Sequence, residues 1–511
     1  MRSSLKCAPS GGLPSQGKRV SMRPQFSFEA HHHRHLRESF SRCRLRGLMR
    51  LRGTDHLGWG CLLVMALCLL LAFAPSAEAK PNLLLIVTDD QRYDSLAVMP
   101  STRENFSVDF KTAIVTTPLC CPSRASILTG EYAHNHGVKT NLDAPIFTAR
   151  AADSLGPWLQ QQGYFTGLVG RYLNKYAFTD PLPAGFDEAH YMTWDEAGNR
   201  LGNFHTVFRL REFWKDAAGD AHDEVVDYPN DTNPNPYATR VFGALGARFI
   251  RRAHDPAINP EEKPWALVLW PTAPHSPLVV EPRYSDALVP PWIRPPSFRE
   301  EDMRDKPREV RELATSYGRS YFVRRRDKTL RMLMSVDDMV ERIWDKVDDY
   351  GERSNTWGIY SSDNGFFFGE HRLNSKLLAY EESARVPFRM AVPEAGPVQI
   401  GRSIVANIDI APTLTALAEA PPRESFDGRS LLPLLSGECF CGRRLLIENW
   451  FLREYQAVRT PHWKYVRWPS GAEELYDLKR DPYELENVAR QPSRAAVLDA
   501  LRAELDGLLM E

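Results

Sequence analysis

Cysteine is scarce in this chain, which has eight cysteines among 511 residues. Half of them precede residue 80, and the rest of the chain holds four: Cys120, Cys121, Cys439 and Cys441. So few cysteines in a long chain exclude a disulfide-dense scaffold, and neighbouring cysteines bridge each other only with strain. A structural zinc site is not indicated, because C-C and C-x-C differ from the C-x2-C spacing and no histidine pair lies nearby.

An excess of basic residues is also missing once the N-terminal segment is set aside. Residues 80–511 contain 52 Lys and Arg against 61 Asp and Glu, which gives a net charge of about −9. This balance argues against a nucleic-acid partner. Any anion that the protein binds must therefore be held by a local site and not by the overall electrostatic field.

A long apolar run, LGWGCLLVMALCLLLAFA, lies at residues 57–74. It follows a flank with twelve Lys and Arg and precedes Ala77-Glu78-Ala79, an A-x-A cleavage pattern. Together these features predict a signal peptide at 49–79 and an exported protein, whether secreted, periplasmic, cell-surface or lysosomal. The alternative is an uncleaved anchor, which would be the chain's contact with a membrane. A signal of ordinary proportions starts at Met49, so residues 1–48 are interpreted as an over-extended N-terminus or a basic tail.

Three short apolar runs predict buried strands at Leu83–Val87, Trp265–Trp270 and Trp357–Tyr360. Amphipathic stretches separate them, and the clearest, SVDDMVERIWDKV at residues 335–347, has helical spacing. Alternating strands and helices predict an α/β fold with a largely parallel sheet, in which functional sites form at the carboxyl ends of strands. Polar clusters follow each run directly, at residues 89–90, 272–275 and 361–364.

The sequence predicts two structural parts after the signal. Residues 80–420 form the larger part, with long Pro- and Asn-rich loops between Asn199 and Pro296 (YPNDTNPNPY and PPWIRPP). Residues 421–511 are predicted to form a smaller antiparallel subdomain. Its elements are a hairpin of YQAVRT and WKYVRW, a strand at EELYDL and a terminal helix from about Ser493.

The stretch LCCPSRASILTG at residues 119–130 contains the pattern C-x-P-S-R-x-x-x-L-T-G. Taken alone, it predicts a helix N-terminus with Pro122 in the first turn, where free N–H groups attract anions. The pattern resembles the signature of the type I sulfatases in the alkaline-phosphatase-like superfamily. This resemblance implies an α/β/α sandwich with a large, mostly parallel mixed sheet and the smaller C-terminal antiparallel subdomain.

The same resemblance implies the chemistry of Cys120. In this family the first cysteine of the signature is oxidised after synthesis to formylglycine, so a formylglycine-generating enzyme would be a partner during maturation. A hydrated aldehyde has two hydroxyls: one attacks sulfur, and the second, once deprotonated, expels sulfate by breaking a C–O bond. Cys121 occupies the free position of the pattern and has no assigned role.

Four residues supply hard oxygen atoms of the kind that bind calcium or magnesium: Asp89, Asp90, Asp363 and Asn364. Such pairs are common in solvated turns, but together with the signature they match the sulfatase metal site, to which Cys120 also contributes after oxidation. The resemblance implies calcium, with magnesium as the alternative. The cation would lower the pKa of the aldehyde hydrate and offset the charge of sulfate.

The resemblance also assigns roles to several basic residues. Arg124 would fix the hydrated aldehyde and the metal, whereas His275 and Lys376 would bind sulfate and protonate the leaving oxygen. His371 is a second candidate for the acid. Arg171 would bind sulfate with its guanidinium fork.

One segment departs from the family pattern. Many sulfatases read G-K-W-H where this chain reads GRYLN at residues 170–174. Arg171 can replace the charge of the lysine but cannot give up a proton. The histidine that often serves as base is missing, which leaves His134 and His136 as candidate substitutes.

The motif G-[KR]-Y-L-N, with CCPSR and APHSP, resembles the N-acetylglucosamine-6-sulfatase and heparan endosulfatase branch of the family. The expected function is an exported sulfatase that cleaves sulfate esters of a sulfated sugar or aryl alcohol. A phosphonate monoester hydrolase or phosphodiesterase of the same superfamily is the enzymatic alternative. The non-enzymatic alternative is a binding protein that keeps the pocket but is never matured, so that Cys120 stays a cysteine.

Overall fold

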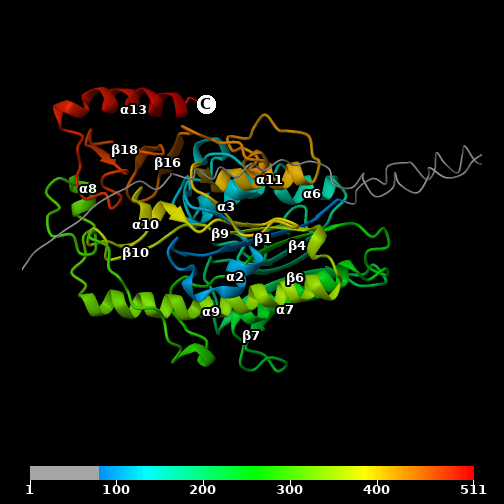
Figure 1. Cartoon of the computed structure of the whole chain (residues 1–511). Coiled ribbons are helices and arrows are strands. Elements are labelled where there is room, and N and C mark those ends of the chain that lie inside the picture. The colour runs from blue at the N-terminus through cyan, green and yellow to red at the C-terminus, as the bar shows by residue number, and fades with distance from the viewer. Residues whose placement is uncertain (1–79, 511) are drawn as a thin grey trace, which may run out of the picture. The chain divides into compact units, whose positions relative to one another are not determined.

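The computed structural model describes residues 80–510 (Figure 1). The predicted signal peptide or anchor at 49–79 and the extension at 1–48 lie outside the described residues. None of the helices within the described range combines the length and apolar character that a membrane crossing requires.

The structure contains many short elements and a few long ones. The strands are β1 (Asn82–Thr88), β2 (Val108–Phe110), β3 (Ala113–Ile114), β4 (Phe165–Gly170), β5 (Glu188–Met192), β6 (Phe208–Lys215), β7 (Ala221–Tyr228), β8 (Trp265–Trp270), β9 (Thr356–Ser362), β10 (Phe367–Phe368), β11 (Asn374–Ser375), β12 (Arg385–Val386), β13 (Arg389–Ala391), β14 (Val398–Ile400), β15 (Val405–Ala406), β16 (Leu445–Asn449), β17 (Tyr455–Arg459), β18 (Trp463–Arg467) and β19 (Glu473–Asp477). The α-helices are α2 (Pro100–Asn105), α3 (Cys120–Thr129), α4 (Ala133–His136), α5 (Ala144–Arg150), α6 (Leu155–Gln161), α7 (Ala238–Ala253), α8 (Arg308–Arg311), α9 (Arg319–Asp349), α10 (Glu381–Ala384), α11 (Ile410–Leu417), α12 (Leu432–Leu435) and α13 (Ala495–Leu508).

One large mixed sheet organises residues 80–420. Its strand order is β14-β2-β13-β9-β1-β8-β4-β5-β6-β7. The central strand β1 pairs in parallel with β9 and with β8, and β4 and β5 continue the parallel part. Strands β13 and β6 run antiparallel to both of their neighbours. The three predicted strands are β1, β8 and β9, so the largely parallel α/β sheet is confirmed.

Helices cover both faces of this sheet (Figure 1). Helices α3, α6 and α11 share a buried apolar cluster with one face of β1, whereas α7 and α9 share another with the opposite face. The sequence predicted a helix at 335–347, which is the C-terminal half of the 31-residue α9. Its apolar side chains point to the sheet because they recur at helical spacing. The α/β/α layering is therefore confirmed.

The region 199–296 contains more regular structure than the sequence indicated. The segments 229–237 and 290–296 are loops as predicted. Before the first of these loops, however, β6 and β7 form an antiparallel hairpin at the edge of the sheet. Between the two loops, α7 packs on α9. The sequence AHDEVVDY of β7 gave no strand signal, because most of its side chains are exposed and polar.

The C-terminal segment has the predicted antiparallel form. Strands β16, β17, β18 and β19 pair in chain order, β17 and β18 form the expected hairpin, and α13 follows. Strand β16 was not predicted, nor was the disulfide between Cys439 and Cys441 in the connection before it. The predicted boundary between residues 420 and 421 remains a prediction. An ion pair crosses it, because the buried Lys464 of β18 binds Glu381 of α10.

Candidate active site

Helix α3 brings the signature to the carboxyl ends of the central strands. The helix starts at Cys120, has Pro122 in its first turn and is buried along its whole length. Gly130 ends it in the left-handed conformation, with a φ of 76°, which glycine adopts without strain. The Cys120 thiol consequently lies at the amino end of a buried helix, where backbone N–H groups are free of intrahelical partners.

Cys121 lies apart from this site. Its side chain is fully buried in the apolar cluster between α3 and the sheet, and it forms no disulfide. Burial raises the pKa of its thiol to about 12. Cys121 is therefore a small apolar side chain of the core, which accounts for a residue that the sequence could not explain.

Two strand ends supply the oxygen atoms of the site. Thr88 of β1 lies opposite Ser362 of β9 in the parallel ladder, so Asp89-Asp90 and Asp363-Asn364 leave the sheet side by side. The Asp90 N–H donates to Asp363 Oδ1 at 3.2 Å, and Asn364 Nδ2 donates to Asp90 Oδ1 at 2.7 Å. All four side chains are buried. Asp90 has a φ of 69°, a left-handed conformation that aspartate tolerates better than most residues.

Three cationic side chains face these carboxylates. Arg124 donates to Asp89 Oδ2 at 2.9 Å and to Asp363 Oδ2 at 3.0 Å. Arg171 donates to Asp89 Oδ2 as well. The Lys376 ammonium lies 2.8 Å from Cys120 Sγ and also binds Asp90 Oδ1.

His275 completes the set. Its Nε2 lies 3.9 Å from Asp90 Oδ2, while Nδ1 contacts the carbonyl oxygen of Ser276. The side chains of His275 and Lys376 are 21% and 9% exposed, so the site opens to solvent on their side. The structure thus brings together all nine residues that the sequence singled out, although their roles remain predictions.

Burial and charge set the protonation states. Burial opposes ionisation of Asp89, but Arg171 and the other cations hold its pKa well below the usual range. Burial and the Asp89 carboxylate raise the pKa of Cys120 far above that of an ordinary thiol. Cys120 is therefore a neutral thiol, and an unmodified neutral thiol is a poor nucleophile. Burial lowers the pKa of His275.

These residues fit a divalent cation. Oxygen atoms of Asp89, Asp90 and Asp363 lie within 4.8 Å of one another. Asn364 Oδ1 lies 3.2 Å from the Lys376 ammonium, which itself occupies a position among Asp90, Asn364 and Cys120. The Lys376 ammonium thus shows that the oxygen atoms of Asp90 and Asn364 attract a positive charge. Buried carboxylate and amide oxygens are the ligands that calcium and magnesium prefer.

The other three histidines that were considered make their contacts elsewhere. His371, the second candidate for the acid, is buried with Nδ1 2.6 Å from Glu300 Oε2. His134 binds Glu448 Oε1 at 3.1 Å, and His136 Nε2 lies 3.0 Å from Ser126 Oγ. The hydrogen bonds of these rings within residues 80–510 do not include Cys120. The carboxylate that does contact Cys120 Sγ is Asp89, whose Oδ1 lies at 3.6 Å.

Two residues near the site were missed by sequence reasoning. Arg325 of α9 donates to Ser276 Oγ at 2.6 Å and lies over the Phe366 ring at 4.5 Å. The Phe204 ring lies under Arg171, 5.1 Å from its guanidinium carbon. Arg325 belongs to the run RRRDK, and such a charged run is typical of a solvent-exposed surface. Phe204 is not part of any sequence motif that would indicate a functional site.

His136 should weaken the fold in acid. Burial, reinforced by Arg150, lowers its pKa to about 3. The unfolded chain binds this proton near pH 6.5, so the free energy of unfolding falls as pH drops towards 3, by at most about 1.4 kcal/mol per pH unit. Urea unfolding of a His136→Gln variant should accordingly show a weaker pH dependence than wild type between pH 6 and 4. Equal slopes would contradict this.

An α/β/α sandwich with this buried group of carboxylates, cations and one cysteine at its strand ends is the arrangement that the resemblance to the alkaline-phosphatase-like superfamily implies. The chain belongs to the sulfatase family, whose model, described as Sulfatase, matches residues 81–420. A second model, described as N-sulphoglucosamine sulphohydrolase, C-terminal, matches residues 369–511. The family assigned from the signature is therefore confirmed.

Curated relatives support the same branch of the family. The chain is 32% identical over 386 residues to an extracellular sulfatase SULF-1 homolog of Drosophila melanogaster, covering 73% of this chain and 32% of that protein. It is 30% identical over 404 residues to N-acetylglucosamine-6-sulfatase of Homo sapiens, covering 74% and 68%. The chain thus spans about a third of the fly protein, and half of a worm homologue.

Solved structures share the fold. A protein solved with its substrate D-glucosamine-2-N,6-O-disulfate superposes with a TM-score of 0.67 at 21% identity, covering 84% of this chain and 97% of that one. A phosphonate monoester hydrolase of Agrobacterium radiobacter gives 0.63 at 20% identity, covering 84% and 95%. At this level of identity the likeness concerns the fold.

Proposed function

We propose that this sulfatase is exported and hydrolyses sulfate esters of a sulfated sugar, such as N-acetylglucosamine 6-sulfate units, with formylglycine made from Cys120 and a divalent metal. One observation supports the proposal most strongly: Cys120 lies beside four residues with candidate metal-binding oxygen atoms and three cationic side chains, at the carboxyl ends of the central strands. The printed names of the relatives, N-acetylglucosamine-6-sulfatase and extracellular sulfatase, support the substrate class and the export.

The charges of the site suit an anionic substrate. Three carboxylates, Asp89, Asp90 and Asp363, are balanced by Arg124, Arg171 and Lys376. A bound calcium or magnesium ion would offset the charge of the sulfate group and lower the pKa of an oxygen bound to it. With that charge added, the site has a net positive charge, which attracts the single negative charge of a sulfate ester.

The residues around Cys120 have separable tasks. Formylglycine, as its hydrate, supplies one hydroxyl that attacks sulfur and a second whose deprotonation expels sulfate. Arg124 holds Asp89 and Asp363 in place through two hydrogen bonds. Asp89 Oδ1 accepts a hydrogen bond from the atom at the Cys120 Sγ position and so orients that atom.

His275 and Lys376 stand at the open side, where the sulfate ester enters. The Lys376 ammonium stays charged, because Asp90 raises its pKa against the effect of burial. It therefore binds sulfate oxygens. His275 is neutral near pH 7, because burial lowers its pKa, and it donates its proton to the leaving oxygen only after taking one up.

Parallel turnover assays test the reaction class. The matured protein is expected to hydrolyse p-nitrophenyl sulfate and N-acetylglucosamine 6-sulfate faster than a p-nitrophenyl phosphonate ester. The comparison is needed because a phosphonate monoester hydrolase shares this fold. Faster phosphonate turnover would reverse the assignment, and no turnover of any ester by protein that carries formylglycine would favour a binding protein.

A further inference from the structure

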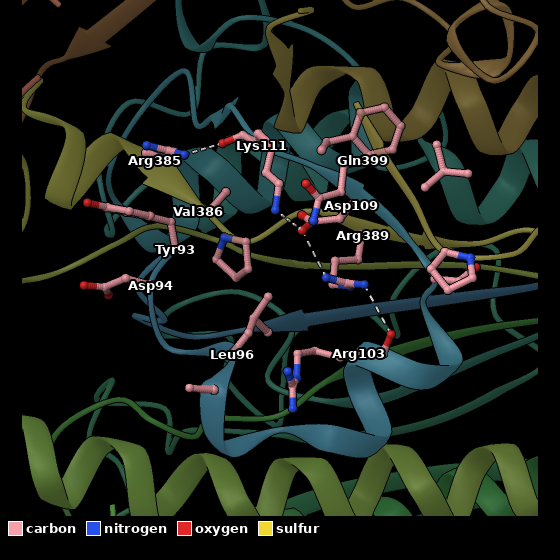
Figure 2. A pocket seen from close by; sticks show the side chains of 16 residues that line it. Tyr93, Asp94, Leu96, Arg103, Asp109, Lys111, Arg385, Val386, Arg389 and Gln399 are labelled. Atoms are coloured by element: carbon pink, nitrogen blue, oxygen red, sulfur yellow. Dashed lines mark hydrogen bonds and ion pairs between the residues drawn. The ribbon is translucent and has the colours of Figure 1, made fainter. Parts of the chain in front are cut away.

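A cavity separate from the catalytic residues lies beside strands β2 and β14 of the large sheet (Figure 2). Its volume is about 730 Å³, within the usual range for small-molecule sites. Four cationic residues from separate segments line it: Arg103, Lys111, Arg385 and Arg389. We call it the basic pocket. Such a concentration of positive charge stands out, because residues 80–511 carry a net charge of about −9.

The acidic groups of the basic pocket do not balance its cations. Asp109 is shared, with Oδ2 lying 2.7 Å from Lys111 Nζ and 3.2 Å from Arg389 Nη1. The other lining carboxylate, Asp94, accepts hydrogen bonds from Nε and Nη2 of Arg92, each at 2.9 Å. Two carboxylates therefore stand against four cations in the lining, which gives the pocket an excess of about two positive charges.

Two of the cations have no carboxylate partner within residues 80–510. Arg103 forms no ion pair there, and its backbone carbonyl accepts a hydrogen bond from Arg389 Nη2 at 3.2 Å. Arg385 donates to the Lys111 carbonyl and lies 4.3 Å over the Tyr93 ring. Its Nε is buried and has no hydrogen-bond partner in this part of the chain. These guanidinium groups can donate to a ligand.

Arg389 is the buried cation of the basic pocket. Its side chain is 8% exposed, and its Nε donates to the Phe106 carbonyl at 2.6 Å. Burial lowers its pKa, Asp109 raises it, and the positive charge of Arg103 lowers it by a smaller amount than Asp109 raises it. Arg103 and Arg389 are thus close enough to interact, and an anion bound between them would weaken their repulsion.

The basic pocket lies towards the same end of the sheet as the catalytic residues, which is the end where β1 and β9 have their carboxyl ends. Asp109 of β2 is opposite Arg389 of β13, which is opposite Tyr360 of β9, three residues before Asp363. Strand β2 is two strands from β9 and three from β1, which is a sideways separation of about 10–14 Å at about 4.8 Å per strand. Tyr93 and Asp94 of its lining also follow closely after Asp90.

We propose that the basic pocket is an anion subsite, which binds a second sulfate or carboxylate group on the carbohydrate chain whose sulfate ester is cleaved at Cys120. Guanidinium forks bind such oxyanions through two parallel hydrogen bonds. The inference rests on the proposed function, because it assumes a sulfated sugar longer than one residue. An enzyme with this subsite prefers oligosaccharides to small aryl sulfates.

Binding without turnover tests the subsite separately from catalysis. A heparin-derived hexasaccharide is titrated calorimetrically into full-length Cys120→Ala protein with and without a further Arg103→Ala and Lys111→Ala pair. Both added substitutions concern exposed side chains, so the fold should persist, which melting temperature checks. We expect about tenfold weaker binding in the pocket variant, the effect of losing a charge-assisted contact. Unchanged affinity would overturn the proposal.

Three comparisons sharpen this test. Lys479→Ala removes an exposed cation of the C-terminal subdomain and should leave affinity unchanged, whereas an equal loss there would point to non-specific attraction and overturn the subsite. Carboxyl-reduced and N-desulfated hexasaccharides identify whether carboxylate or sulfate occupies the pocket. If the pocket variant unfolds, Arg103→Gln alone replaces it, and unchanged affinity again overturns the proposal.

Turnover distinguishes failure of the subsite from failure of the proposed function. In otherwise wild-type protein, the Arg103→Ala and Lys111→Ala pair should lower the ratio of kcat/KM for a sulfated hexasaccharide to that for p-nitrophenyl sulfate by about tenfold. An unchanged ratio in an active enzyme refutes the subsite alone. A wild-type protein that carries formylglycine but hydrolyses neither substrate refutes the proposed function instead.

Discussion

Cys120→Ala is expected to lower kcat for p-nitrophenyl sulfate by about four to six orders of magnitude, as removal of a covalent nucleophile does in other hydrolases. The reason lies in the environment of Sγ. It faces Asp89 Oδ1 at 3.6 Å and the Lys376 ammonium at 2.8 Å, at the amino end of α3. Burial and Asp89 keep the unmodified thiol neutral and therefore a poor nucleophile, which is consistent with the proposed conversion of Cys120 to formylglycine.

Mass spectrometry of the peptide around residue 120 measures that group directly. In an active preparation, the Cys120 side chain should have changed from a thiol to an aldehyde, so that the peptide loses its sulfur and a pair of hydrogens and gains an oxygen. Cys121→Ala is the matched control, since the adjacent thiol is buried in the apolar core and forms no disulfide. This control should keep turnover and the modification while losing stability. An unmodified thiol in fully active protein would refute the formylglycine mechanism.

The sequence predicted that the candidate metal ligands would meet, because parallel strands place their carboxyl ends together, whereas the catalytic roles were implied by the resemblance to the sulfatase signature. Two runs, at 83–87 and 357–360, sufficed to bring Asp89 and Asp363 to one edge, and the structure confirms that β1 and β9 pair in register. The terminal antiparallel strands were predictable for a similar reason, since alternation and a short turn define a hairpin locally. Local pattern and strand topology thus account for most of what was foreseen.

Other features depend on contacts that no local pattern encodes. His134 and His136 read as possible bases, but Glu448, which lies 314 positions from His134, fixes that ring, and Ser126 pairs with the second. The basic pocket joins Arg103 and Lys111 to Arg389 across almost 300 residues of chain. Each of its cations reads alone as a solvated surface charge, and only the strand order brings them together.

Removing divalent cations with a chelator is expected to lower kcat for aryl sulfate hydrolysis by about a thousandfold, since a metal contributes several kcal/mol of charge stabilisation. Asp89, Asp90 and Asp363 then retain Arg124, Arg171 and Lys376 as their cations. The Lys376 ammonium remains bound to Asp90 and Asn364 Oδ1, where it is not free to bind sulfate. Adding calcium back should restore activity.

Melting temperature gives a readout that does not depend on activity. A cation at about a hundred times its dissociation constant stabilises the fold by about 2.7 kcal/mol, which in a domain of this size raises Tm by about 3 °C. Asp363→Asn should lose this rise, because it removes one of three clustered carboxylates. Asp337→Asn is the matched control: this buried carboxylate binds Thr102 instead and its variant should keep the rise. Equal responses of the two variants would contradict the assignment.

Calcium should raise Tm more than magnesium. The four oxygen-bearing residues are buried and supplied by two rigid strand ends, so the protein offers several ligands of its own at fixed positions. Calcium accepts such a set with variable geometry, whereas magnesium demands a near-ideal octahedron and retains several water molecules. Burial leaves little room for those waters. A larger rise in Tm with magnesium would therefore indicate a more open and hydrated site than the contacts of Asp89 and Asp363 imply.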